Sequence, residues 1–176
     1  MIDQFTKTAV ERTLLSLLKN APHYYLKSQS IENIIEHNGR RFYSKYRLIK
    51  KKPEKRILNE HLKERLTLAV PLNENYLSIE YFGSECKRFL HLLVRVLKDF
   101  SVEKSYVYKS RGDGTLKVLL IIKDGDTDGV IKAISSNLSK KLQKEWRFLP
   151  DKSLPESYNI FVLPRDRTDI ALIPHL

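Results

Sequence analysis

The chain has 176 residues, of which 41% are hydrophobic and 30% are charged, so it can form one domain or two small ones with a real core. Its net charge of +11 favours anionic partners such as nucleic acid, nucleotides or acidic membrane surfaces, although a proteome that is basic throughout would produce the same balance. The single cysteine excludes an intramolecular disulfide and a cysteine-based zinc site, and the longest apolar run, Val118–Ile122, is far too short to span a bilayer.

The first part of the chain is predicted to contain a helix at residues 3–20, short strands at 23–26 and 31–37, a basic strand from residue 40, and a helix at 53–67. Residues 31–37 also fit a short helix capped by Ser30, but Asn38-Gly39 favours a strand. Asn-Gly between two strand-like runs is the strongest short hairpin signal, because both residues tolerate positive φ.

The second part is predicted to contain a strand at 77–82, a helix of about 15 residues from 83–84, hairpin strands at 105–109 and 116–123, a helix capped by Asp126 or Thr127, and extended runs at 146–149 and 158–163. This order is β-α-β-β-α-β with one extra strand, and the tail at 164–176 is predicted to be extended coil. The predicted fold is therefore α+β, an antiparallel sheet with a ferredoxin-like βαββαβ core plus an N-terminal helix and a basic β-hairpin.

The turn-rich stretch at 71–75 is the predicted boundary between two regions, 1–72 and 73–176, which could also form one integrated domain. The N-terminus shows no signal-peptide pattern, so a cytoplasmic protein is expected. RNA-recognition modules present aromatic residues on the open face of such a sheet, but the third strand here has Leu119 and Ile121 in those places.

Residues 40–56 carry the most informative pattern, with nine Lys or Arg against one Glu and three aromatic residues among them. As a strand, this stretch would place Tyr43 and several cations on one face and Phe42, Tyr46 and Leu48 on the other. Cations neutralise phosphates, and an exposed tyrosine stacks on an unpaired base. The alternative is a solvated edge strand whose lysines discourage pairing with another sheet. The candidate nucleic-acid or phosphate-binding residues are Arg40, Arg41, Tyr43, Lys45, Tyr46, Arg47, Lys50, Lys51 and Lys52.

The candidate metal ligands are carboxylates in the second region, namely Glu80, Asp124, Asp126 and Asp128. Residues 124–129 match the start of a calcium loop, but Lys132 and Ser135 stand where that loop needs its last ligands. The structural alternative is a turn before an acid-capped helix. Carboxylates on neighbouring strands would otherwise hold divalent cations, as in palm-type nucleotidyl or phosphoryl transfer.

His23-Tyr24-Tyr25 and the stretch 35–43, Ile-Glu-His-Asn-Gly-Arg-Arg-Phe-Tyr, resemble a domain family of unknown function from epsilonproteobacteria of the Helicobacter and Campylobacter type. The resemblance implies no activity. The residues themselves predict a protein that binds nucleic acid or a nucleotide through the basic strand. The two alternatives are a divalent-metal-dependent transferase and a protein-interaction or homo-oligomerising module that pairs through a sheet edge. No reaction and no oligomeric state follow from the sequence.

Overall fold

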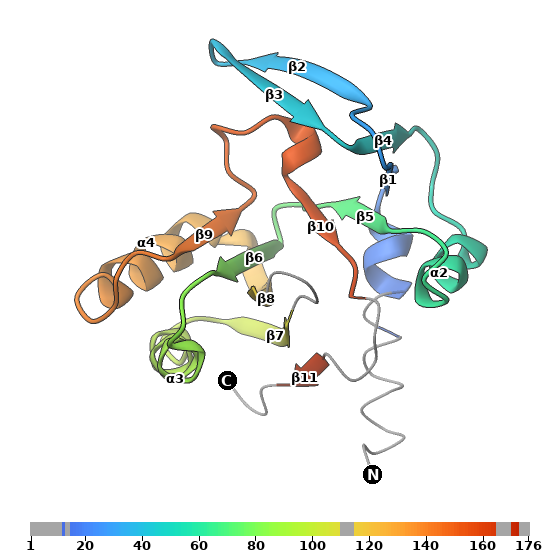
Figure 1. Cartoon of the computed structure of the whole chain (residues 1–176). Helices are drawn as coiled ribbons and strands as arrows, with labels where there is room; N and C mark the ends of the chain where they lie inside the picture. Colours follow the sequence, from blue (N-terminus) through green and yellow to red (C-terminus); the bar gives the residue numbers. More distant parts are fainter. Residues whose placement is uncertain (1–11, 13–14, 110–114, 165–169, 173–176) are drawn as a thin grey trace. The chain divides into compact units, whose positions relative to one another are not determined.

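The structure is a computed structural model, and it describes residue 12 and residues 15–109, 115–164 and 170–172 (Figure 1). The described residues form two compact units. The first contains residues 12, 15–72 and 150–164, and the second contains residues 73–109, 115–149 and 170–172. Helices and antiparallel sheets occur together, so the predicted α+β class is confirmed. Whether either unit folds independently stays a prediction.

The first unit contains a four-stranded antiparallel sheet, a separate hairpin and short helices. The sheet has the order β10-β5-β1-β4, and its strands are β1 (Tyr24–Lys27), β4 (Tyr46–Ile49), β5 (Leu68–Pro71) and β10 (Ile160–Val162). The hairpin is β2 (Asn33–His37) with β3 (Arg40–Ser44), and the helical segments are residues 15–20, α2 (Lys55–Leu62) and the 3-10 helix η2 (Glu156–Tyr158). Residues 3–11, 13 and 14 of the predicted first helix lie outside the described residues.

The helix predicted at 53–67 is shorter than expected, because it ends at Leu62 and the chain then turns through Glu64, whose φ is 61°. Leu68–Pro71 then forms β5, a strand that was not predicted. Its first three residues, Leu68, Ala69 and Val70, are buried, and it pairs with β1 on one side and β10 on the other. Because β10 pairs with β5, the extended run predicted at 158–163 belongs to the sheet of the first unit.

The second unit has the predicted βαββαβ order. Its elements are β6 (Tyr76–Tyr81), α3 (Cys86–Leu97), β7 (Val102–Lys109), β8 (Leu116–Ile122), the 3-10 helix η1 (Lys123–Gly125), α4 (Thr127–Leu138), β9 (Trp146–Leu149) and β11 (Ile170–Leu172). All pairs are antiparallel in the order β11-β7-β8-β6-β9. The turn predicted at 111–114 lies outside the described residues. The tail at 164–176 was predicted to be extended coil, but Ile170–Leu172 within it forms the short strand β11, which pairs with β7.

Both long helices of the second unit pack on one face of its sheet. Leu77, Ile79 and Tyr81 of β6 share a buried core with Phe89 of α3 and Ile134 of α4. The opposite sheet face is also buried: its residues Tyr76, Ser78, Glu80, Tyr106, Tyr108 and Leu119 are each at most 7% exposed. The rings of Tyr76, Tyr106 and Tyr108 on this face are therefore covered and not available for RNA-recognition-type stacking, whereas Phe82, which directly follows β6, is 52% exposed and has the Arg147 guanidinium carbon 5.3 Å from its ring centroid. Among the described residues, no helix has both the length and the apolar character needed to cross a membrane.

Candidate nucleic-acid interface

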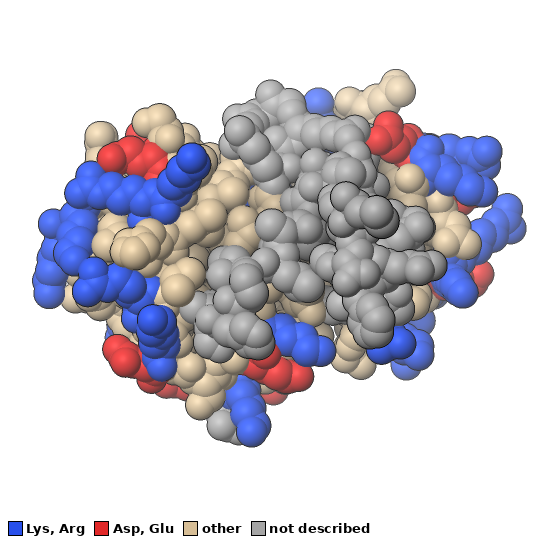
Figure 2. Space-filling view, turned by 90° about the horizontal axis from the view of Figure 1, so that it is seen from below, with Lys and Arg blue, Asp and Glu red and all other residues tan. Residues whose placement is uncertain are grey.

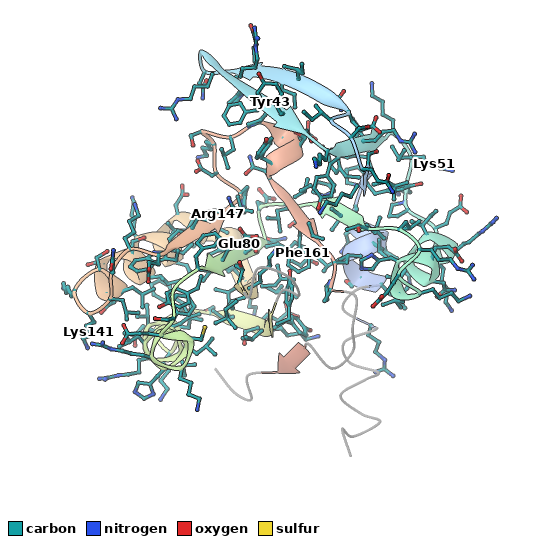
Figure 3. The ribbon with its side chains drawn as sticks, viewed as in Figure 1. Tyr43, Lys51, Glu80, Lys141, Arg147 and Phe161 are labelled. Atoms are coloured by element: carbon teal, nitrogen blue, oxygen red, sulfur yellow. The ribbon has the colours of Figure 1, made fainter. Side chains whose placement is uncertain are left out.

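The β2–β3 hairpin is built by the Asn38-Gly39 turn, as predicted. Asn38 has φ 50° and Gly39 has φ 72°, the positive values that a tight hairpin turn requires. Ile34 lies directly opposite Tyr43, so the two side chains project from the same face. They are 62% and 51% exposed, respectively, which leaves an apolar pair open to solvent. The hairpin therefore presents exposed Tyr43 near the start of the basic stretch (Figure 3), with exposed Ile34 opposite it on the neighbouring strand.

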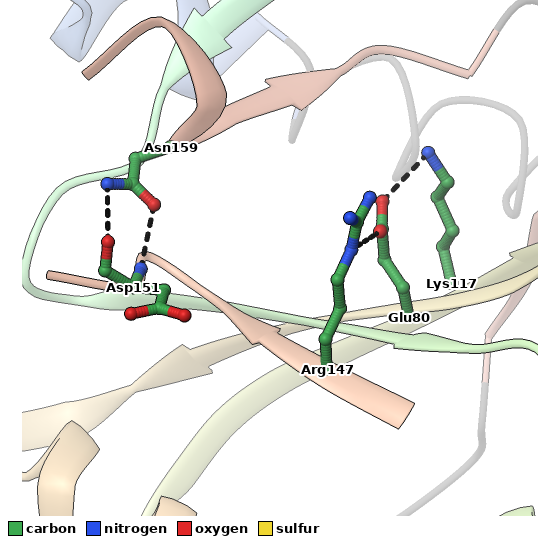
Figure 4. A network of polar contacts seen from close by, with 5 residues as sticks. All are labelled: Glu80, Lys117, Arg147, Asp151 and Asn159. Atoms are coloured by element: carbon green, nitrogen blue, oxygen red, sulfur yellow. Dashed lines mark hydrogen bonds and ion pairs between the residues drawn. The ribbon is translucent and has the colours of Figure 1, made fainter. Parts of the chain in front are cut away.

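The other face of the hairpin is held by the returning C-terminal segment of the same unit. The Tyr158 hydroxyl donates a 2.8 Å hydrogen bond to the Tyr43 carbonyl, and the Tyr158 ring packs edge-on against Phe42 at 5.3 Å between centroids. Two hydrogen bonds between Asp151 and Asn159 stabilise this segment (Figure 4). The backbone N–H of Asp151 donates to Asn159 Oδ1 at 2.7 Å, and Asn159 Nδ2 donates to the backbone carbonyl of Asp151 at 2.9 Å. Tyr158 fixes the backbone that carries Tyr43, a contribution that the sequence did not indicate.

The basic stretch is not one strand, contrary to the prediction. It breaks at Lys45: β3 pairs only with β2, whereas β4 pairs with β1 in the four-stranded sheet. Buried Ser44 makes the break, because its hydroxyl accepts a 3.1 Å hydrogen bond from the Tyr46 amide. The Lys45 carbonyl accepts a 2.7 Å hydrogen bond from Ser28. The cations are therefore distributed over a hairpin, a bend, an edge strand and the loop before α2.

All but one of the candidate binding residues are exposed. The exposed ones are Arg40, Arg41, Tyr43, Lys45, Arg47, Lys50, Lys51 and Lys52. Tyr46 is half-buried and packs against the cluster of Tyr25, Ala69 and Ile160, which makes its ring part of the sheet's packing. Tyr43 is therefore the tyrosine of this stretch that can receive a base.

The cations of the stretch are weakly neutralised within the protein. Arg41 lies 3.2 Å from the Glu36 carboxylate and Lys51 lies 3.8 Å from Glu54, and both pairs are exposed. Such surface pairs contribute about 0.2–1 kcal/mol, so a phosphate can displace them. The remaining seven cations of the stretch form no ion pair with another described residue; they are Arg40, Lys45, Arg47, Lys50, Lys52, Lys55 and Arg56.

The candidate metal ligands do not converge in the described part of the chain. The Glu80 carboxylate is buried and already engaged by two cations, Lys117 at 3.1 Å and Arg147 (Figure 4). Asp126 caps α4 by accepting a 3.0 Å hydrogen bond from the Gly129 amide, and Asp128 is exposed in the first turn of that helix. The Asp124 side chain lies outside the described residues. No group of three or more His, Cys, Asp or Glu among the described residues could hold a metal ion.

A polar cluster that sequence reasoning missed surrounds His23 and Tyr25. His23 Nε2 lies 3.1 Å from a Glu156 carboxylate oxygen, and the rings of His23 and Tyr25 meet edge-on at 5.5 Å between centroids. Burial, together with the negative charge of Glu156 and a hydrogen bond to it, raises the pKa of Tyr25 to about 12. This cluster joins β1 to η2, so the His-Tyr-Tyr motif has a structural role within the unit.

Comparison with known protein families finds one family model that matches part of the chain. Residues 10–80 match the family described as "Domain of unknown function (DUF1882)". The match covers less than half of the chain, and it includes the hairpin, the basic stretch and β6 as far as Glu80. It agrees with the resemblance to a family of unknown function, whereas the bacterial group stays a prediction. The segment that carries Tyr158 and β10 lies beyond the matched residues. A search of curated proteins found no match to the chain.

Proposed function

We propose that the protein binds nucleic acid through the basic stretch of its first unit. The observation that carries this proposal is the sequence of exposed cations from Arg40 to Lys52, which contains no acidic residue and has an exposed tyrosine inside it. A solvated edge strand would account for the lysines. It would not account for Tyr43 and its cross-strand neighbour Ile34 on β2, which are both more than half exposed.

Charge and stacking contribute differently to this binding. The exposed cations would replace counterions around phosphates, which supplies affinity without sequence specificity. Tyr43 would stack on a base, and stacking of this kind contributes about 1–3 kcal/mol per base. Bases within a duplex are already stacked on each other, so Tyr43 favours unpaired bases. The proposed ligand is therefore a single-stranded segment whose backbone follows Arg41, Lys45 and Arg47.

The test is fluorescence anisotropy with labelled single-stranded and duplex oligonucleotides at several salt concentrations. The log of the affinity should fall linearly with the log of the salt concentration, with a slope of about −0.7 per phosphate contact for single strands and about −0.9 for duplex. The double substitution Lys45→Glu with Arg47→Glu should weaken binding strongly and make the slope shallower.

The matched control is Lys19→Glu with Lys63→Glu, which changes the net charge equally at two exposed residues outside the basic stretch. The control should retain most of the affinity. Equal losses in the two variants would mean that net charge alone attracts the ligand. The absence of salt-dependent binding by the unsubstituted protein would refute the proposed function.

A further inference from the structure

The outward face of α3 is a second cationic surface, located on the other unit. The exposed ionisable residues of the helix are Lys87, Arg88, His91 and Arg95, and exposed Lys98 follows its last residue. Apart from the adjacent pair Lys87 and Arg88, these residues are spaced by three or four positions, which places them along one side, because an α-helix has 3.6 residues per turn. At 1.5 Å per residue this stripe is about 16 Å long. No acidic residue occurs between positions 86 and 98.

Cations at the start of α3 lower the stability of this helix. Lys87 and Arg88 lie in the first turn, where the helix dipole disfavours cations, and that turn contains no acidic residue. Glu85 offsets Arg88 at 3.0 Å, but this pair is exposed and Lys87 forms no ion pair with another described residue. Both long helices have an acidic N-cap residue, Glu85 in α3 and Asp126 in α4, but only the Asp126 side chain accepts a hydrogen bond from its helix, and only α4 has an acidic residue, Asp128, in its first turn. Residues that oppose local stability are often retained for binding.

The loop after α4 extends the stripe at the start of α3. The Phe82 amide donates a 2.7 Å hydrogen bond to the Glu145 carbonyl, so the loop lies beside the residues that lead into α3. This loop presents three exposed lysines, Lys140, Lys141 and Lys144. One group of Lys and Arg side chains lies at the left of the face shown in Figure 2, with Asp and Glu side chains beside it, and further Lys and Arg side chains lie at the right. Lys141 projects from this loop (Figure 3).

The chemistry of the stripe selects among anionic partners. Phe89, Leu93 and Leu97 of α3 are at most 1% exposed in the core of the unit, and the other apolar residues of the helix are buried or half-buried. The helix therefore has no apolar face with which to enter a bilayer, as an amphipathic membrane helix does. A protein partner would need an apolar centre to its interface, which the stripe also lacks. A nucleic-acid backbone is bound through charge alone.

We propose that the α3 stripe and the 140–144 loop form a second, sequence-independent contact surface for the phosphate backbone of the same nucleic acid. This inference takes its ligand from the proposed function but concerns a different unit and different residues. A strand long enough to reach both surfaces would be bound by both units, which raises the overall affinity through effective concentration.

The test measures salt-dependent binding of the full chain to a single strand of about 40 nucleotides, a length that allows several binding sites of this kind. The stripe variant Lys87→Glu with Arg95→Glu should bind on the order of tens-fold more weakly at 50 mM salt, with a slope shallower by about 1.4 for two lost contacts. The control, Lys104→Glu with Lys123→Glu, makes the same charge change at exposed residues of the same unit and should bind almost as the unsubstituted protein does.

Four outcomes separate the two proposals. Loss of affinity in both the stripe variant and the Lys45→Glu, Arg47→Glu variant supports both surfaces. If only the Lys45→Glu, Arg47→Glu variant loses affinity and the stripe variant binds as its control does, the inference is overturned and the proposed function remains intact. Loss in the stripe variant alone supports the second surface and refutes the first. If the stripe variant instead loses only binding to phosphatidylserine vesicles, the surface is a membrane contact and the inference is overturned.

Discussion

His61 provides the sharpest test of the first unit's architecture. Its side chain is fully buried, the Leu68 amide donates a 3.1 Å hydrogen bond to Nδ1, and Nε2 lies 3.0 Å from the Leu163 carbonyl. Because the amide can only donate, Nδ1 accepts, so Nε2 carries the proton and donates to the carbonyl. One imidazole thereby connects α2 to the start of β5 and to the chain just after β10.

Replacing His61 by leucine should strongly destabilise this unit. The substitution leaves the Leu68 amide and the Leu163 carbonyl buried without this partner. Each unsatisfied buried group costs about 1–3 kcal/mol, so the free energy of unfolding should fall by about 2–6 kcal/mol. His61→Gln, which keeps a donor and an acceptor, should lose less. The measurement is urea unfolding followed by far-UV circular dichroism, combined with hydrogen exchange at the Leu68 amide.

Exposed His91 supplies the control, since His91→Leu removes a histidine without breaking a buried hydrogen bond. A loss below about 1 kcal/mol in His61→Leu would contradict the hydrogen-bond account, because even one unsatisfied group should cost that much. Trp146 is the single tryptophan and belongs to the second unit. Its fluorescence therefore shows separately whether the second unit remains folded.

Three further predictions concern single side chains. Tyr43→Ala should weaken binding to single strands about 5- to 150-fold, the equivalent of one stacked base, while duplex binding and the Tyr43→Phe variant should change little in anisotropy titrations. Because the pKa of Tyr25 is raised from about 10 to about 12, its neutral phenol stabilises the fold below pH 10, and this contribution disappears as the pH rises to 12. Tyr25→Phe should therefore flatten the profile of stability against pH between pH 10 and pH 12. Glu156→Gln should move the loss of stability to lower pH, because it removes the negative charge that helps to raise the pKa of Tyr25. Gly83→Ala should destabilise the second unit by about 1–3 kcal/mol in urea unfolding monitored by tryptophan fluorescence, because the new methyl group would overlap the Tyr81 hydroxyl; a neutral result would show that the loop can move aside.

The local parts of the fold were predictable because their signals are local. Asn38-Gly39 defined the hairpin turn, and the helical periodicity around Phe89 and Leu93 defined α3. The break at Lys45 was not predictable from such patterns. Exposed and covered positions keep alternating from Arg41 to Leu48, so nothing in the periodicity marks the change of partner from β2 to β1. Strand partners are decided by tertiary packing, which a single sequence does not display.

The candidate site was also predictable only in its local features. Exposure of the cations followed from the alternation, and the alternation also placed Tyr46 beside Phe42 and Leu48 on the covered face. The signal against Tyr46 as a stacking residue was therefore present in the sequence. The contribution of Tyr158 was not, because it comes from a segment 115 positions away from Tyr43. The short run Leu68–Pro71 was also missed, since four apolar residues next to a helical pattern fit either a helix or a strand.

Lys87 can distinguish a binding surface from the general basicity of the chain. If the cations only reflected a basic proteome, removing Lys87 would leave the affinity for nucleic acid almost unchanged, whatever it did to the stability of the helix. The position of Lys87 in the first turn of α3 predicts instead that Lys87→Glu stabilises the second unit by about 0.3–1 kcal/mol, because it replaces an unfavourable charge at the helix N-terminus by a favourable one. The same substitution should weaken binding to a long single strand. The stability measured by urea unfolding with Trp146 fluorescence should thus rise, while the affinity measured by anisotropy titration should fall. A gain in stability with unchanged affinity would show that Lys87 contacts no phosphate, and a loss of stability would contradict the electrostatic argument for the helix.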